Sequence, residues 1–251
     1  MGVGWTQVAL AGIWGGLVAV ERKAFLQAMF SRPLVAATLM GGLLDDVQAG
    51  LFVGLLLELF HLGGANLGAS LPDHDTLSAT SVSAAAAGMS NAWWLSQGGV
   101  GGLPSSEPFF WSTAVLLFIG LGRVGRWVDR RLERYAARLA KKALLLAEAG
   151  ELTRAMRQNL WGVWPHFVVF GAITSACALV GWGLGPWVAR LPEPVLRGLD
   201  WAYPAMAAVC AAIAARGSHA KRASFYALLG AGAVCLAVLL VVLLAVLKER
   251  P

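Results

Sequence analysis

The chain has 251 residues, of which 58% are hydrophobic and only 14% are charged, and its mean hydropathy is +0.66. This composition excludes a soluble globular enzyme and is typical of an integral membrane protein. We therefore expect an all-α, polytopic membrane protein with about seven to nine membrane segments, including discontinuous or re-entrant helices.

Apolar runs follow one another along the chain. They occupy residues 5–20, 33–44, 47–64, 78–95, 108–121, 163–187, 199–215 and 224–247. A helix needs about 20 residues to cross the hydrocarbon core, so only the last three runs are comfortable single spans. The first run has no basic residue before it and no clear cleavage site after it, which indicates a membrane segment rather than a signal peptide.

The second and third runs are interrupted by polar residues. Asp45 and Asp46 separate them, Glu58 lies inside the third run, and Gly63 and Gly64 end it. Short apolar segments broken by glycine and charge are typical of discontinuous helices, whose irregular ends commonly line a transport site. We interpret residues 32–80 as a substrate-site hairpin region. The alternative is an ordinary tight hairpin of two packed helices.

Residues 33–122 contain acidic side chains and no Lys or Arg. A carboxylate in hydrocarbon costs roughly 3 kcal/mol, so such groups are expected to face a cavity, a partner or a solute. The candidate substrate-binding residues are Glu58, Asn66, Asp73, His74 and Asp75. This set offers many acceptors, a few neutral donors and no fixed cation, which favours a neutral polyhydroxylated solute over an anion.

Other roles for these side chains are open. The same oxygens could hold a metal ion or Na⁺, although His61 and His74 have no His or Cys partner at metal-ligand spacing, so we predict no metal site. Asp45 and Asp46 are predicted to form a structural turn at the end of a half-helix rather than to bind the solute. Two adjacent carboxylates in a dry pocket would repel one another until one became protonated.

The segment 123–157 is strongly basic, with ten Lys or Arg residues against four Asp or Glu. Basic loops mark the cytoplasmic side of a membrane protein, so we place this segment there. Apolar residues from Val124 to Leu146 recur at helical spacing, which predicts a helix lying along an anionic bilayer surface. A specific partner site is the alternative. No nucleic-acid partner is expected, because the run lies between membrane segments and carries no recognition motif.

Several motifs resemble one bacterial transporter family. They are Arg32-Pro33-Leu34-Val35-Ala36, Leu44-Asp45-Asp46 with Gly50 four residues on, Leu57-Glu58-Leu59, Leu62-Gly63, Asn66-Leu67-Gly68-Ala69 and Pro72-Asp73. Their order and spacing resemble the membrane subunit IIC of the mannose/fructose/sorbose family of sugar phosphotransferase systems (PTS). The resemblance extends more weakly over the rest of the chain.

This resemblance implies a single permease domain over residues 1–251, in a bacterial cytoplasmic (inner) membrane, that translocates a hexose-type sugar. It implies a paired membrane subunit IID, an oligomeric complex, and soluble IIA and IIB phosphocarriers. A separate IIB protein would supply the phosphate, so no cofactor and no catalytic residue are expected in this chain. The absence of a GxxxxGK[ST] motif agrees with this.

Three departures from the family pattern leave other functions open. Asp45 stands where the family usually has Gly, and His61 stands where small or apolar residues are usual. Either Asp73 or Asp75 can take the acidic position after Pro72. A cation-coupled secondary transporter using Asp46 and Glu58 is one alternative. A non-transporting regulatory membrane subunit is the other.

Overall fold

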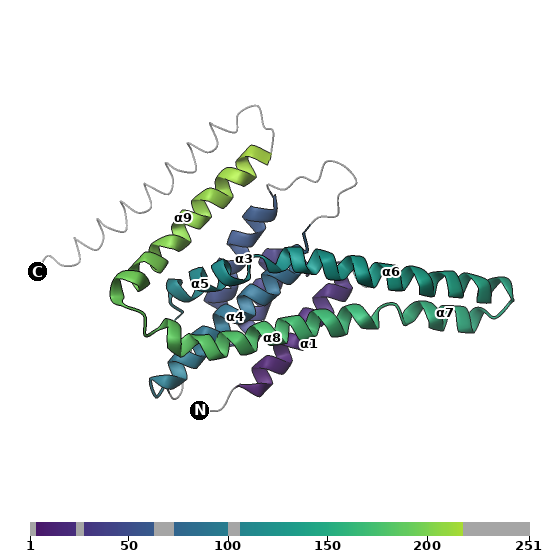
Figure 1. Cartoon of the computed structure of the whole chain (residues 1–251), viewed down its shortest axis with the longest axis horizontal. Helices are drawn as coiled ribbons and strands as arrows, with labels where there is room; N and C mark the ends of the chain where they lie inside the picture. The colour runs from purple at the N-terminus through teal and green to yellow at the C-terminus, as the bar shows by residue number, and fades with distance from the viewer. Residues whose placement is uncertain (1–3, 24–27, 63–72, 100–105, 218–251) are drawn as a thin grey trace, which may run out of the picture.

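The computed structural model describes residues 4–23, 28–62, 73–99 and 106–217, and within these ranges it contains helices and no strand (Figure 1). The helices are α1 (Trp5–Lys23), α2 (Pro33–Leu43), α3 (Val47–Leu62), α4 (Asp75–Ser96), α5 (Pro108–Phe118), α6 (Leu121–Glu148), α7 (Leu152–Leu160), α8 (Trp164–Val188) and α9 (Glu193–Gly217). The predicted all-α class is thus confirmed for the described residues.

Helix α4 lies at the centre of the body, and every residue from Thr76 to Ala92 is buried. It packs most extensively against α8 and also contacts α2, α3 and α5. The contact with α8 is so close that a Cβ atom on Gly181 would collide with the backbone of Ala85. One turn later, Gly185 meets Met89 in the same way. In lipid, small residues stabilise helix pairs by allowing backbones to approach, and this seam is built on that principle.

Helices α2 and α3 form a short hairpin against α4. Pro33 begins α2, and a Cβ on Gly41 would collide with the backbone of Gly50, so the two helices pack at backbone distance. The turn between them includes Asp45, whose φ of 62° is in the left-handed region. With 11 and 16 residues, neither helix is long enough to cross the bilayer alone.

The described helices include two that are long and apolar enough to cross a membrane, α8 and α9. A third crossing results if α5 and α6, which meet at a bend of 43°, form one broken span. The predicted spans 163–187 and 199–215 therefore coincide with α8 and α9. The predicted span 224–247 lies outside the described residues, and the total number of crossings stays a prediction.

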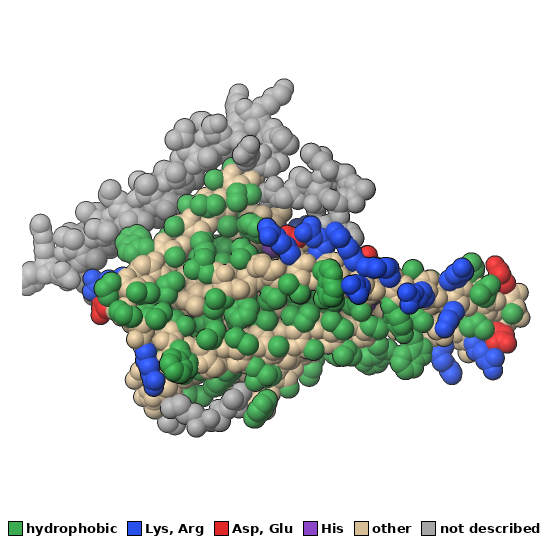
Figure 2. Space-filling view, viewed as in Figure 1, with side chains coloured by type: hydrophobic (Ala, Val, Ile, Leu, Met, Phe, Trp, Pro, Cys, Tyr) green, Lys and Arg blue, Asp and Glu red, His purple; other side chains and the backbone are tan. Residues whose placement is uncertain are grey.

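Helix α6 begins on the body and then leaves it. There Gly125 is buried, and a Cβ atom on it would collide with the side chain of His74, at the start of α4. Its later part and α7 form a helical hairpin that extends beyond the body, here called the arm (residues 134–160) (Figure 1). Lys and Arg side chains are distributed along it (Figure 2). Helix α6 thus contains the predicted helical stretch from Val124 to Leu146, and the chain then reverses at Gly150, where φ is +81°, before α7 begins.

Candidate functional site

The predicted substrate residues near position 74 lie at the N-terminus of α4. His74 is the N-cap: its Nδ1 accepts a hydrogen bond of 3.0 Å from the Leu77 N–H. Because Nδ1 is an acceptor, the neutral ring carries its proton on Nε2. Burial, together with the charges of Arg22 and Lys23, lowers the pKa of His74 well below its ordinary value of 6.5. His74 is therefore a neutral helix cap in this geometry.

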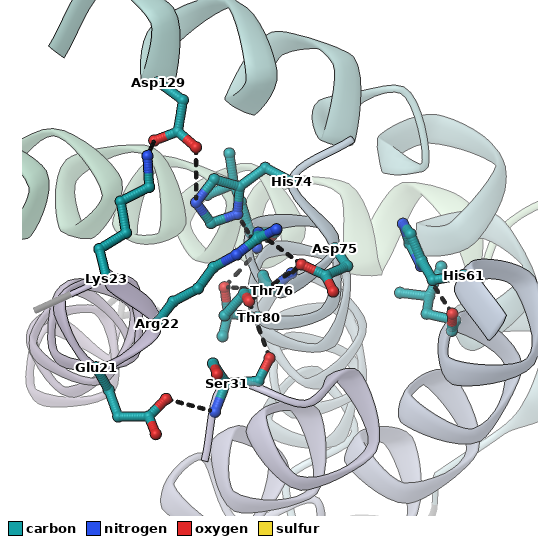
Figure 3. Close-up of polar contacts among 12 residues, drawn as sticks. Glu21, Arg22, Lys23, Ser31, His61, His74, Asp75, Thr76, Thr80 and Asp129 are labelled. Carbon is teal, nitrogen blue, oxygen red and sulfur yellow. Dashed lines mark hydrogen bonds and ion pairs between the residues drawn. The ribbon is translucent and has the colours of Figure 1, made fainter. Parts of the chain in front are cut away.

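The acidic residues on either side of His74 are paired with arginines. Asp75 lies 2.6 Å from Arg22 Nη1, at the end of α1 (Figure 3). Asp73 lies 3.2 Å from Arg126 of α6. These ion pairs tie the beginning of α4 to two other helices.

Glu58 lies near the C-terminal end of α3 and faces the beginning of α2. Its Oε2 accepts a hydrogen bond of 3.2 Å from the Leu34 N–H, and its Oε1 lies 3.4 Å from Arg32 Nη1. The first N–H groups of a helix have no partner within the helix, so a carboxylate there satisfies one of them and interacts favourably with the helix dipole. The Glu58 side chain is still 18% exposed.

The expectation that this region has no fixed cation is wrong. Arg22, Arg32 and Arg126 pair with Asp75, Glu58 and Asp73, respectively. All three arginines come from outside residues 33–122, which is why the count along that stretch missed them. The region is consequently charge-balanced rather than acidic.

Ser31 joins α1 and α4 through its backbone. Its N–H donates to Glu21 Oε2 at 2.9 Å, and its carbonyl accepts from the Thr76 hydroxyl at 2.9 Å (Figure 3). We call the assembly around it the polar junction: Glu21, Arg22, Ser31, Arg32, Glu58, Asp73, His74 and Asp75. It brings together the end of α1, the start of α2, the end of α3 and the start of α4.

Asp129 of α6 lies beside this junction. Its Oδ1 is 3.1 Å from Lys23 Nζ and 3.9 Å from His166 Nε2, and its Oδ2 is 3.9 Å from His74 Nε2. Lys23 also lies 2.7 Å from Glu133, one helical turn further along α6. Side chains from α1, from the N-cap of α4 and from α8 therefore surround this carboxylate of α6.

The sequence reasoning missed Glu21, Arg22, Lys23, Ser31 and Asp129. A weak signal for Asp129 was available, because Asp129 and Glu133 are acidic residues at i, i+4 spacing within an otherwise cationic helix. Such a pair faces the same side and favours a cation supplied by another segment. No comparable signal marks Glu21 or Ser31.

The two residues of the predicted turn have different surroundings. Asp46 is 3% exposed, and its oxygens accept hydrogen bonds from the Ala49 N–H at 3.0 Å and from the Ser106 hydroxyl at 2.9 Å. Asp45 is exposed and accepts from the Gln7 amide at 3.1 Å. Asp46 thus accepts a hydrogen bond from a backbone N–H in the first turn of α3, a geometry in keeping with the predicted structural role. Asn66 lies outside the described residues.

Comparisons with known proteins agree with the fold and with the predicted family. The family model described as PTS system sorbose-specific IIC component matches residues 5–247. This chain belongs to that family. It is accordingly a membrane protein of the PTS sugar-transport type, as the motifs around Asp46 and Glu58 predicted.

Individual relatives of this IIC chain are distant. The sorbose-specific EIIC component of Lacticaseibacillus casei is 32% identical over 80 residues, which are 32% of this chain and 28% of that protein. The aligned part is thus less than a third of that relative's length.

Two solved structures share the fold at 20% identity. One, described only as a membrane protein, has a TM-score of 0.62 and is matched over 98% of this chain and 96% of its own. The other belongs to the mannose transporter ManYZ in complex with a microcin, with a TM-score of 0.55 over 100% of this chain and 98% of its own.

Proposed function

We propose that this protein is the IIC permease subunit of a bacterial phosphotransferase system in the cytoplasmic membrane. It translocates a hexose-type sugar, and a separate IIB protein supplies the phosphate. Family membership over residues 5–247 is the observation that carries this proposal. The names of the relatives, which refer to sorbose and mannose, support a hexose as the substrate class.

The polar junction is the proposed sugar site, with Glu58 as its central ligand and Asn66, Asp73, His74 and Asp75 as the further substrate-binding residues. A carboxylate has about four acceptor positions, so Glu58 can bind sugar hydroxyls in addition to Leu34 and Arg32. The three ion pairs of Arg22, Arg32 and Arg126 supply both donors and acceptors without a net charge of their own, which suits a neutral polyol. The same arginine pairing disfavours Glu58 as a cation ligand in a secondary transporter.

The proposed assembly includes a paired membrane subunit IID and soluble IIA and IIB phosphocarriers. The exposure of helix α9 supports the proposal that a membrane partner or lipid covers it, because only 6% of its most apolar stretch is buried within this chain. The basic segment 123–157 is proposed to lie on the cytoplasmic side, in contact with anionic lipid. We propose that the single domain acts within an oligomeric complex.

The test is a Glu58→Gln substitution in the complex with its paired membrane subunit. Glutamine retains an oxygen for the Leu34 N–H, so the complex should assemble with an unchanged thermal midpoint. Sugar affinity, measured by calorimetry, should fall at least tenfold, or about 1.4 kcal/mol. Glu193→Gln is the matched control, because Glu193 is exposed and also pairs with an arginine, Arg197. Unchanged sugar binding and uptake in Glu58→Gln would contradict the assignment.

A further inference from the structure

A hollow of about 250 Å³ lies beside Ser31, between the end of α1 and the segment that leads into α2. Its walls are formed by Glu21, Arg22, Met29, Ser31 and Arg32. Apart from Met29, these residues are polar or charged. A ligand that enters the hollow therefore meets hydrogen-bond donors and acceptors together with apolar side-chain carbons.

The two arginines of the hollow already have carboxylate partners. Arg22 is paired with Asp75 at 2.6 Å and Arg32 with Glu58 at 3.4 Å. Each guanidinium has five N–H groups, so each retains donors after making one ion pair. The arginines thus offer hydrogen bonds while their positive charge is neutralised.

Two residues of the hollow, Glu21 and Arg22, have a buried side-chain atom without a hydrogen-bond partner among the described residues, and Glu21 is the acceptor of the two. It is only 6% exposed, and Oε2 accepts from the Ser31 N–H at 2.9 Å. The other oxygen, Oε1, is buried and has no hydrogen-bond partner among the described residues. A buried carboxylate oxygen without a donor is costly, because the water that it gave up has not been replaced. Because Glu21 lines the hollow, a donor bound there lies next to this carboxylate.

We propose that Glu21 is a sugar-binding residue, and that its Oε1 accepts a hydrogen bond from a hydroxyl group of a neutral hexose in this hollow. The inference rests on the proposed function. Ser31 fixes the orientation of the carboxylate, and the remaining N–H groups of Arg22 and Arg32 donate to other sugar oxygens. The hollow adjoins the ion pairs of both Glu58 and Asp75, so it extends the proposed sugar site.

The charges of the hollow also predict its specificity. The arginines are paired with Asp75 and Glu58, whereas Glu21 accepts a hydrogen bond from the Ser31 N–H and has no ion pair within the described part of the chain. A second anion brought next to the buried carboxylate of Glu21 would be repelled by its charge. The site should therefore bind neutral hexoses and exclude hexuronates, which carry a carboxylate at C6, even though two arginines line it.

The experiment compares wild type, Glu21→Gln and Glu148→Gln, each purified with the paired membrane subunit. Glutamine keeps an oxygen for the Ser31 N–H, and Glu148 is an exposed carboxylate at the tip of the arm. Affinities for mannose, fructose and sorbose, and for mannuronate as the matched hexuronate, are measured by calorimetry. Thermal midpoints without sugar report on folding.

Wild type and Glu148→Gln should bind a hexose and reject mannuronate. Glu21→Gln should bind that hexose at least tenfold more weakly, with an unchanged midpoint and a smaller preference for hexose over hexuronate. Equal hexose affinity in Glu21→Gln and wild type would overturn the inference. A loss of affinity that accompanies a lowered midpoint would also overturn it, because the role would then be structural. Failure of the wild-type complex to bind any hexose would instead refute the proposed function.

Discussion

Helices α4 and α9 have nearly opposite environments. Helix α4 is buried from Thr76 to Ala92, yet it is rich in Ser, Thr and Ala and is not among the helices apolar enough to qualify as membrane spans. Helix α9 qualifies as a span, yet only 6% of its most apolar stretch is buried. Hydropathy alone therefore does not show which helix is packed at the centre of this chain.

The largest effect is expected at the seam between α4 and α8. A Gly181→Leu substitution places a side chain against the backbone of Ala85, which cannot move without displacing α4. We expect a loss of stability of about 3 kcal/mol, or failure to fold. Gly183→Leu is the control, since a Cβ at Gly183 has nothing within 4 Å. The thermal midpoint in detergent measures both, and similar midpoints for the two variants would contradict the close packing.

A matched pair of truncations sharpens the comparison between α4 and α9. Val82 of α4 is 0% exposed, and Val209 of α9 is 59% exposed. Val82→Ala leaves a cavity and should cost about 1–2 kcal/mol. Val209→Ala removes the same atoms from an open surface and should change stability by less than about 0.5 kcal/mol. Equal losses of unfolding free energy in the isolated chain would show that α9 is packed as tightly as α4.

The smallest effect is expected from the cap of α4. His74 is held neutral beside Arg22, Lys23, Asp129 and His166, and its pKa is lower in the folded chain than in the unfolded chain. Below about pH 6.5 the unfolded state takes up a proton that the folded state excludes, so stability should fall as the pH decreases through this range. Asparagine also caps helices, so His74→Asn should retain the cap and reduce this pH dependence of the thermal midpoint. An identical pH dependence in His74→Asn and wild type would refute this role.

Local composition was enough to predict much of the fold. The all-helical class, the two short helices separated by Asp45 and Asp46, and the spans that became α8 and α9 all follow from apolar runs and their interruptions. The helical spacing from Val124 to Leu146 lies within α6, whereas the reversal at Gly150 and the second helix after it leave no break in the charge pattern. The number of crossings depends on segments beyond the described residues.

The candidate site was harder to predict because its contacts are distant in sequence. Arg22 is 53 positions from Asp75, and Arg126 is 53 positions from Asp73, so no periodicity relates either pair. Glu58 was recognisable as a carboxylate within an apolar run, but its partner Arg32 lies on the other side of the helix hairpin. Residue type therefore located the carboxylates, whereas only the fold could show that arginines neutralise them.

The position of Asp129 gives the arm a mechanical connection to the body. From Asp129 to the end of α6 the helix continues for 19 residues, which at 1.5 Å per residue is a rigid rod of about 28 Å. Near its fixed end, Lys23 contacts this carboxylate, and His74 and His166 lie close to it. A force applied at the tip, for instance by a docked protein or a moving lipid surface, would turn the rod about this point. The displacement would reach the first turn of α4 directly, so the arm can act as a lever on the polar junction.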